Sequence, residues 1–170
     1  MKNKCVSFVG LLSIVILVFF AAGCDSNNSN DGIDVSDPSS MVGTFDLVLI
    51  HDKTGEFFEG SGQTYPGGED FEIDVQVDEN STLTATARFE ITLTLTATRY
   101  TMLTDIQMSI PGFPSEGDTD TDTGAWSVSG STITIVSDDT DFGAETFEIA
   151  GSGDSLSLED EDLIMTFKRR

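Results

Sequence analysis

Residues 81–97 constrain the fold more than any other stretch, because apolar and polar residues alternate through them without interruption. A period of two places every second side chain on one face of a β-strand, so one face of this strand is predicted to be buried. The other face is mostly threonine, a β-branched residue suited to a solvated sheet surface. An all-β, antiparallel fold follows. The predicted buried face consists of Leu83, Ala85, Ala87, Phe89, Ile91, Leu93, Leu95 and Ala97.

This strand is too long to stay straight in a small domain. At about 3.3 Å per residue it would span roughly 55 Å, whereas a domain of this size has a radius of gyration of about 15 Å. No Gly, Pro or Asn interrupts it. We therefore expect a long coiled strand with a bulge near Arg88, of the kind that wraps a barrel.

Residues 1–23 have the pattern of a bacterial secretory signal, in which Lys2 and Lys4 precede an apolar run. The run ends in Ala-Ala-Gly-Cys at residues 21–24, which resembles a lipobox, where a cysteine is diacylated and the chain is cut before it. We expect lipidation of Cys24, with the acyl chains holding the protein at a membrane. A cleaved signal without lipid and an uncleaved anchor are the alternatives, although the apolar run is short for a span.

Residues 24–40 are rich in Ser, Asn and Asp, with Ile33 and Val35 almost the only apolar residues. They are interpreted as a flexible tether that precedes one domain at residues 41–170. Asp25 resembles the inner-membrane retention signal of enteric bacteria, but that rule differs between lineages and leaves both membranes open. The predicted location is the bacterial cell envelope, on the periplasmic side or at the cell surface.

Charge and cysteine content narrow the function classes. Removal of residues 1–23 leaves 147 residues with six basic and thirty acidic side chains, a net charge near −24. This charge argues against nucleic acid as a partner and against docking on anionic head groups, which leaves the lipid as the membrane anchor. We interpret the charge as a source of solubility, with cations or a basic protein as alternative partners. Cys24 would be the sole cysteine of the mature chain, so no disulfide is expected.

From residue 41 onward, short alternating segments separated by Gly, Ser, Pro and Asp predict an antiparallel meander or barrel of eight to ten strands. The first strand, residues 43–51, is expected to carry Phe45, Leu47 and Leu49 on one face and Val48 and Ile50 on the other. Further strands are expected at residues 56–59, 71–77, 99–110, 125–129, 132–137, 145–150, 155–159 and 163–168.

The chain resembles the bacterial lipocalin-like lipoproteins over nearly all of residues 41–170. The likeness is carried by Gly43-Thr44-Phe45, the hairpin region 71–124, the segment 124–135 around Trp126, and the closing segments 156–158 and 165–169. It implies an antiparallel barrel with a central cavity that binds a small apolar ligand. Phe45 replaces the Trp often found in the first motif, and Trp126 is the sole tryptophan. We expect Trp126 in the core, with ligand contact as the alternative, and a basic residue among 168–170 over an aromatic face there.

Residues 112–124 are interpreted as an acidic loop. Asp118, Asp120 and Asp122 alternate as at the start of a calcium loop. An EF-hand, however, needs glycine at position six and glutamate at position twelve, and this stretch has glycine at seven and serine at twelve. A looser calcium site that adds Asp138, Asp139 and Asp141 is the alternative to a solvated loop.

No catalytic constellation is found. His51 is the sole histidine and is expected at a surface turn, and the sequence has neither a Gly-x-Ser-x-Gly elbow nor a phosphate-binding loop. We therefore predict no enzyme, no metal and no cofactor.

Two functions remain ahead of an enzyme, which is a distant third. The first is the binding of a small apolar ligand in a cavity left by the small inward residues Ala85, Ala87 and Ala97. The second is a structural or protein-interaction module whose cavity is filled by Phe45, Phe71, Phe89 and Phe147.

Overall fold

The computed structural model describes residues 32–55, 62–78, 81–141 and 143–170. Within them, a short 3₁₀ helix, η2, precedes a sheet of ten strands. Their bounds are η2 Pro38–Met41, β1 Gly43–Asp52, β2 Gln63–Pro66, β3 Asp70–Asp78, β4 Ser81–Leu95, β5 Arg99–Ser109, β6 Glu116–Ser129, β7 Thr132–Ser137, β8 Ala144–Ser152, β9 Ser155–Glu159 and β10 Leu163–Arg169.

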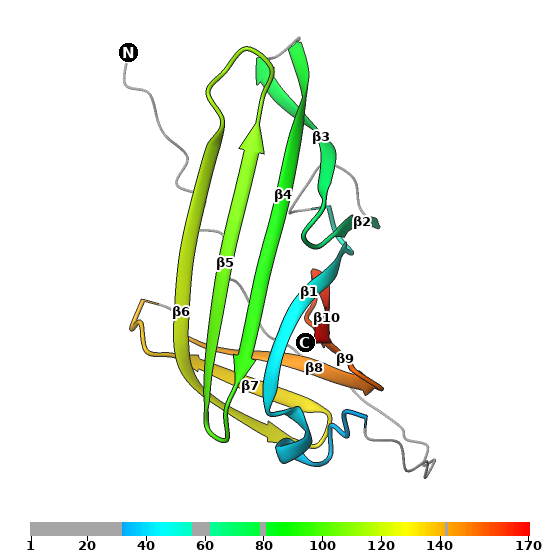
Figure 1. Ribbon diagram of the computed structural model, residues 1–170, viewed down its shortest axis with the longest axis vertical. Helices are drawn as coiled ribbons and strands as arrows, with labels where there is room; N and C mark the ends of the chain where they lie inside the picture. The colour runs from blue at the N-terminus through cyan, green and yellow to red at the C-terminus, as the bar shows by residue number, and fades with distance from the viewer. Residues whose placement is uncertain (1–31, 56–61, 79–80, 142) are drawn as a thin grey trace.

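The sheet closes into a barrel (Figure 1). Its strand order is β2-β1-β10-β9-β8-β7-β6-β5-β4-β3, and β1 also pairs with β4, so β1 and β4 to β10 form a ring of eight strands. Every pairing is antiparallel, and β2 and β3 lie outside the ring. The expected all-β antiparallel barrel is confirmed. The strand expected at residues 56–59 lies outside the described residues.

β4 is the long strand that the alternating pattern predicts. Its inner face is buried from Ala85 to Leu95 except at the half-buried Ile91, with Ala85 and Leu93 both 0% exposed. Ala97, however, lies beyond the end of β4 and is exposed. The expected bulge near Arg88 is wrong, because the pairing of β4 with β5 runs from Thr86 to Leu95 without a register shift.

Register shifts occur instead in the pairing of β1 with β10 and in that of β3 with β4. The pairing of β1 with β10 shifts register between Leu47 and Leu49. An extra residue reverses the side-chain alternation, so Leu49 is 37% exposed while Ile50 is 4% exposed. The expected faces of Leu49 and Ile50 are therefore exchanged.

Residues 116–124 form part of β6, so the acidic loop expected there is wrong. Residues 116–125 pair with β5 in continuous register. Aspartate disfavours strands, but strand propensity depends on context, and the neighbouring β5 offers a full row of backbone partners. The alternation of Asp and Thr through this stretch is a strand pattern of period two.

The folded unit begins earlier than residue 41. Ile33 is 6% exposed, and its N–H donates to the carbonyl oxygen of Gly153 at 2.8 Å. η2 follows, with the side chain of Asp37 as its N-cap and Met41 fully buried at its end. The described part of the predicted tether, residues 32–40, therefore packs against the end of the barrel where β1 begins, as Figure 1 shows for η2.

Large side chains fill the closed part of the barrel. Phe45, Tyr100 and Phe167 are among the largest fully buried residues, and Phe89 and Phe147 belong to the same core. Trp126 also lies in this core, where its indole N–H donates to the carbonyl oxygen of Thr96 at 2.8 Å. The central cavity that the family resemblance implies is therefore occupied by the protein's own side chains.

A cation closes the end of the barrel beside η2, as expected for a basic residue of the last strand. The guanidinium carbon of Arg169 lies 5.2 Å from the ring centroid of Phe45 and not over Trp126. Nη2 of Arg169 donates a hydrogen bond to the carbonyl oxygen of Ser40, and this bond ties the last strand to η2.

Gly124 is required where β5, β6 and β7 meet. A Cβ at this position would lie 2.0 Å from the carbonyl oxygen of Val136 and 2.6 Å from the ring of Tyr100. We expect Gly124→Ala to lower the free energy of unfolding by about 2–3 kcal/mol in urea denaturation, because backbone must move to admit the methyl group. Gly143→Ala is the control, since a Cβ there meets nothing within 4 Å. Equal stabilities of the two variants would contradict this account.

Candidate functional site

Four strands continue past the closed barrel as a curved sheet. β1 leaves β4 after the pair Asp46–Thr92, and β3 pairs with residues 81–88 of β4 instead. We call this region the sheet extension and define it as β3 with residues 81–91 of β4, 104–109 of β5 and 116–120 of β6. Figure 1 shows these strands rising well beyond β7 to β10.

The inner face of the sheet extension continues the barrel interior. Directly opposed residues in antiparallel strands point to the same side of the sheet, so the register defines this face. It carries half-buried apolar side chains from three strands, with the fully buried Ala85 and Ala87 between them. The half-buried residues are Phe71, Ile73 and Val75 of β3, Leu83 and Ile91 of β4, and Ile106 and Met108 of β5.

An aromatic cluster borders this face where β2 meets β3. The ring centroids of Tyr65 and Phe71 are 4.9 Å apart, and those of Phe71 and Phe89 are 5.3 Å apart. Both ring pairs are tilted, and their centroid distances lie in the range of interacting aromatic pairs.

β6 contributes a row of carboxylates to the same inner face. Asp118, Asp120 and Asp122 share the alternation of the buried Trp126, so they point to the side on which the core lies. Their Cα partners on β5 are Ile106, Thr104 and Met102, and Glu116 is paired with Met108. These aspartates stand out in the sequence, but the loop predicted there does not indicate the sheet face that they share.

An acidic group lies where the sheet extension meets the barrel. The carboxylate of Asp122 accepts hydrogen bonds from the phenol of Tyr100 and from the hydroxyl of Ser137, the latter at 2.6 Å. Burial, followed by the hydrogen bond to Asp122, raises the pKa of Tyr100. Burial raises the pKa of Glu145 as well, and the charges of Asp122 and Asp160 add to that shift. Nothing in the sequence distinguished Glu145 from the other acidic residues.

The aspartates considered as calcium ligands do not form a metal site in the part of the chain that the structure describes. Asp118, Asp120 and Asp122 lie in line along β6, and Asp138 forms an ion pair with Arg99. The side chain of Asp139 accepts from the backbone N–H of Asp141, which forms a local turn. The described residues include no group of three or more His, Cys, Asp or Glu placed to hold a metal ion.

Two further residues were considered from the sequence, His51 and Cys24. His51 lies in β1 rather than at a turn, and its Nδ1 is 3.1 Å from the hydroxyl of Thr64. Cys24, the expected lipidation site, lies outside the described residues.

Two depressions on the described surface border the core, since Leu47 lines one and Ile149 the other. The larger, of about 330 Å³, lies where β1 and β4 part and is lined partly by Asp46, Gly67, Ile91 and Arg170. Two hydrogen bonds of 2.7 Å join Arg170 to Asp46 there, and they lower the pKa of Asp46. The smaller, of about 80 Å³, lies between β8 and β9.

An eight-stranded, up-and-down antiparallel ring is the architecture of lipocalins, which streptavidin shares, so the strand pairing gives this protein a lipocalin-like barrel fold. No protein-family model matches the sequence, and no curated protein does. The structure is similar to the crystal structure of a lipocalin-like protein from Bacteroides uniformis ATCC 8492, with a TM-score of 0.45 and 16% identity. That similarity covers 76% of this chain and 97% of the other.

Glu145 should make stability depend on pH. Because its pKa is higher in the folded than in the unfolded protein, the folded state binds the proton more tightly and loses stability as pH rises from the ordinary value of 4.5 through the raised one. Glu145→Gln removes this loss. We expect the urea midpoint of Glu145→Gln minus that of the unmodified protein to increase as the pH is raised from about 4 to about 7.

Glu148→Gln on the exposed face of β8 is the matched control for Glu145→Gln. The account is wrong if the difference in urea midpoint between Glu145→Gln and the unmodified protein stays constant with pH. It is also wrong if Glu148→Gln shows the same pH-dependent difference.

Proposed function

We propose that the protein is a lipid-anchored envelope protein that binds a small apolar ligand on the inner face of the sheet extension. The observation that carries the proposal is a set of half-buried apolar side chains, drawn from three adjacent strands, on a face continuous with the core. Binding sites for apolar ligands are commonly concave and lined by such side chains.

The filled barrel explains why the site lies on the sheet extension rather than in a central cavity. Phe45, Phe147 and Phe167 belong to one continuous core with Leu93 and Leu95. A ligand entering this region would have to displace packed side chains, whereas one on the sheet extension would cover surface that is already partly exposed. The energetic gain is the removal of that apolar surface from water.

A test of the site compares two faces of one strand. Because the core residues in the described part of the chain lie between Ile33 and Phe167, a chain beginning at Asp25 retains every one of them. We expect this protein to bind the neutral dye N-phenylnaphthylamine and to release it on addition of dodecanol. Met108→Gln on the inner face should weaken binding about tenfold, since burying a Met side chain is worth about 1.5 kcal/mol or more.

Leu103→Gln is the matched control, because Leu103 lies on the outer face of β5 and is 43% exposed. It should leave dye affinity unchanged, and urea midpoints will verify that both variants fold. The proposal fails if the unmodified protein does not bind the dye, or if the two variants weaken binding equally.

A protein-interaction module is the second candidate, and the filled core favours it. β3 ends the sheet order, and residues 116–123 of β6 pair only with β5 among the described strands. Such edges can pair with a strand of another chain, although the charges along β3 disfavour indiscriminate pairing.

The anchor is the part of the proposal that rests on sequence alone. It is supported by the secretory pattern and the lipobox-like residues 21–24. In the part of the chain that the structure describes, no helix has the length and hydropathy that a membrane crossing requires. Acyl chains on Cys24 would hold the barrel at the membrane through the residues that precede Gly32.

Lipidation is tested by substitution of each cysteine. We expect labelled palmitate to be incorporated into the protein expressed in a bacterial host, and to be absent from Cys24→Ala. Cys5→Ala should be labelled normally, because Cys5 lies in the signal that is removed. Palmitate on Cys24→Ala, or an unmodified Cys24 in the mature protein by mass spectrometry, would overturn the anchor.

A further inference from the structure

We propose that the ligand of the sheet extension is an amphiphile with a positively charged head group, which lies against the carboxylates of β6 while its apolar part crosses β5 and β4. This inference rests on the proposed function and adds the charge and orientation of the ligand. It follows from the strand register, from the absence of neutralising charges, and from the position of the aromatic cluster.

The register places an acidic residue beside an apolar one in successive rows. Met108 is paired with Glu116, and on its other side with Ala87. One row further toward the barrel, Ile106 is paired with Asp118 and with Phe89. Directly opposed side chains have Cβ atoms about 5 Å apart, so the carboxylates border the apolar face directly.

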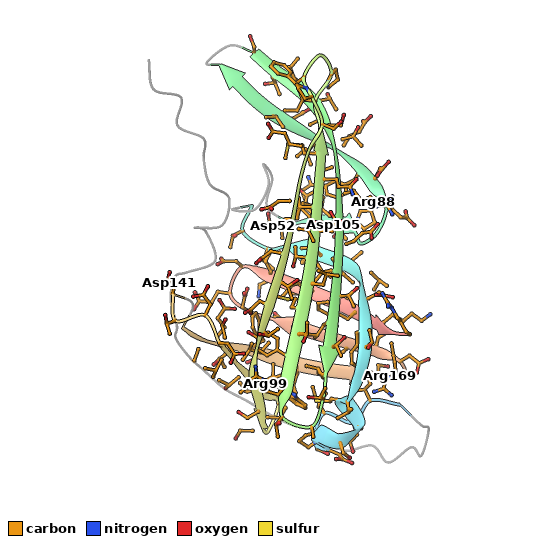
Figure 2. The ribbon with its side chains drawn as sticks, turned by 60° about the vertical axis from the view of Figure 1, so that its left-hand side comes forward. Asp52, Arg88, Arg99, Asp105, Asp141 and Arg169 are labelled. Carbon is orange, nitrogen blue, oxygen red and sulfur yellow. The ribbon has the colours of Figure 1, made fainter. Side chains whose placement is uncertain are left out.

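The described cations do not neutralise these carboxylates. The four ion pairs among the described residues join Lys53 to Glu159, Arg88 to Glu90, Arg99 to Asp138, and Arg170 to Asp46. Arg88 is the basic residue of β4, and it lies on the outer face of that strand with Glu90. Figure 2 shows Arg88 and Asp105 near the base of the sheet extension, with Arg99 and Arg169 at the far end of the barrel.

The carboxylate row favours a cation and opposes an anion. Glu116, Asp118 and Asp120 are exposed, and alternate side chains on a strand lie about 7 Å apart. Their mutual repulsion is relieved by a positive charge placed among them, whereas a fatty-acid carboxylate would add to it. A positively charged head group therefore complements the acidic side of this face, as an alkyl chain complements the apolar side.

The aromatic cluster sets the direction of the apolar part. Phe71 and Phe89 lie on β3 and β4, on the opposite side of the sheet extension from β6. Four strands spaced about 4.8 Å apart span about 14 Å from β6 to β3, a width that suits an extended alkyl chain. The chain would lie across Ile106 and Met108 and end at the aromatic rings.

The experiment compares three probes that share one alkyl chain, namely dodecylammonium, dodecanol and dodecanoate. Each displaces N-phenylnaphthylamine from the chain beginning at Asp25, below its micelle concentration and at low salt. We expect dodecylammonium to bind at least about tenfold more tightly than dodecanol, and dodecanoate more weakly than dodecanol. The preference for the cation should shrink as salt is added, because the carboxylates are exposed.

Two double variants with equal charge change locate the effect. Asp118→Asn with Asp120→Asn on the inner face should abolish most of the preference for dodecylammonium over dodecanol. Asp74→Asn with Asp105→Asn on the outer face should retain the preference. An equal loss in both pairs would show that net charge, not this face, selects the cation.

The outcomes separate this inference from the function on which it rests. Equal binding of the three probes, or tighter binding of dodecanoate, would overturn the cationic head group while leaving apolar binding in place. Failure of the dye and of all three probes to bind would overturn both.

Discussion

The architecture depends on one continuous strand, β4, that belongs to both parts of the single sheet. β4 pairs with β1 through residues 92–95, which closes the barrel, and with β3 through residues 81–88, which builds the sheet extension. The gap between β1 and β4 is bridged by backbone: the N–H of Gly67 donates to the carbonyl oxygen of Val48 and that of Gly68 to the carbonyl oxygen of Phe89. Gly67 can approach β1 so closely because it has no Cβ. A Cβ at this position would lie 2.2 Å from the carbonyl oxygen of Leu47.

This division of β4 separates the closed core from the proposed binding face. The closed part buries Phe45, Leu93 and Phe167 in one core and is sealed by η2 and Arg169. The sheet extension leaves Ile106 and Met108 half-buried beside carboxylates. The proposed binding surface is therefore a face of the sheet, and the barrel is the support that holds its strands together.

Period-two alternation accounts for what could be predicted. It identified β4 and its buried face, and it placed β7 and β8 between the glycine turns at Gly130 and Gly153, with β9 and β10 after them. It did not locate the bulge, because a register shift depends on the partner strand: the shift occurs where Leu47 and Leu49 meet β10. Likewise, the polar composition of residues 32–40 suggested a tether, whereas Ile33 finds a buried place beside Gly151 and Gly153.

The sequence by itself determined the fold class, because the alternation over residues 81–97 is that of a β-strand with one buried face. It also determined the strongly acidic charge. Only the tertiary structure decided the candidate site. The row from Asp118 to Asp122 is a strand because β5 supplies its backbone partners, and it borders apolar residues because the register puts Ile106 and Met102 opposite it. Local composition cannot specify such pairings, because they join residues that lie far apart along the chain.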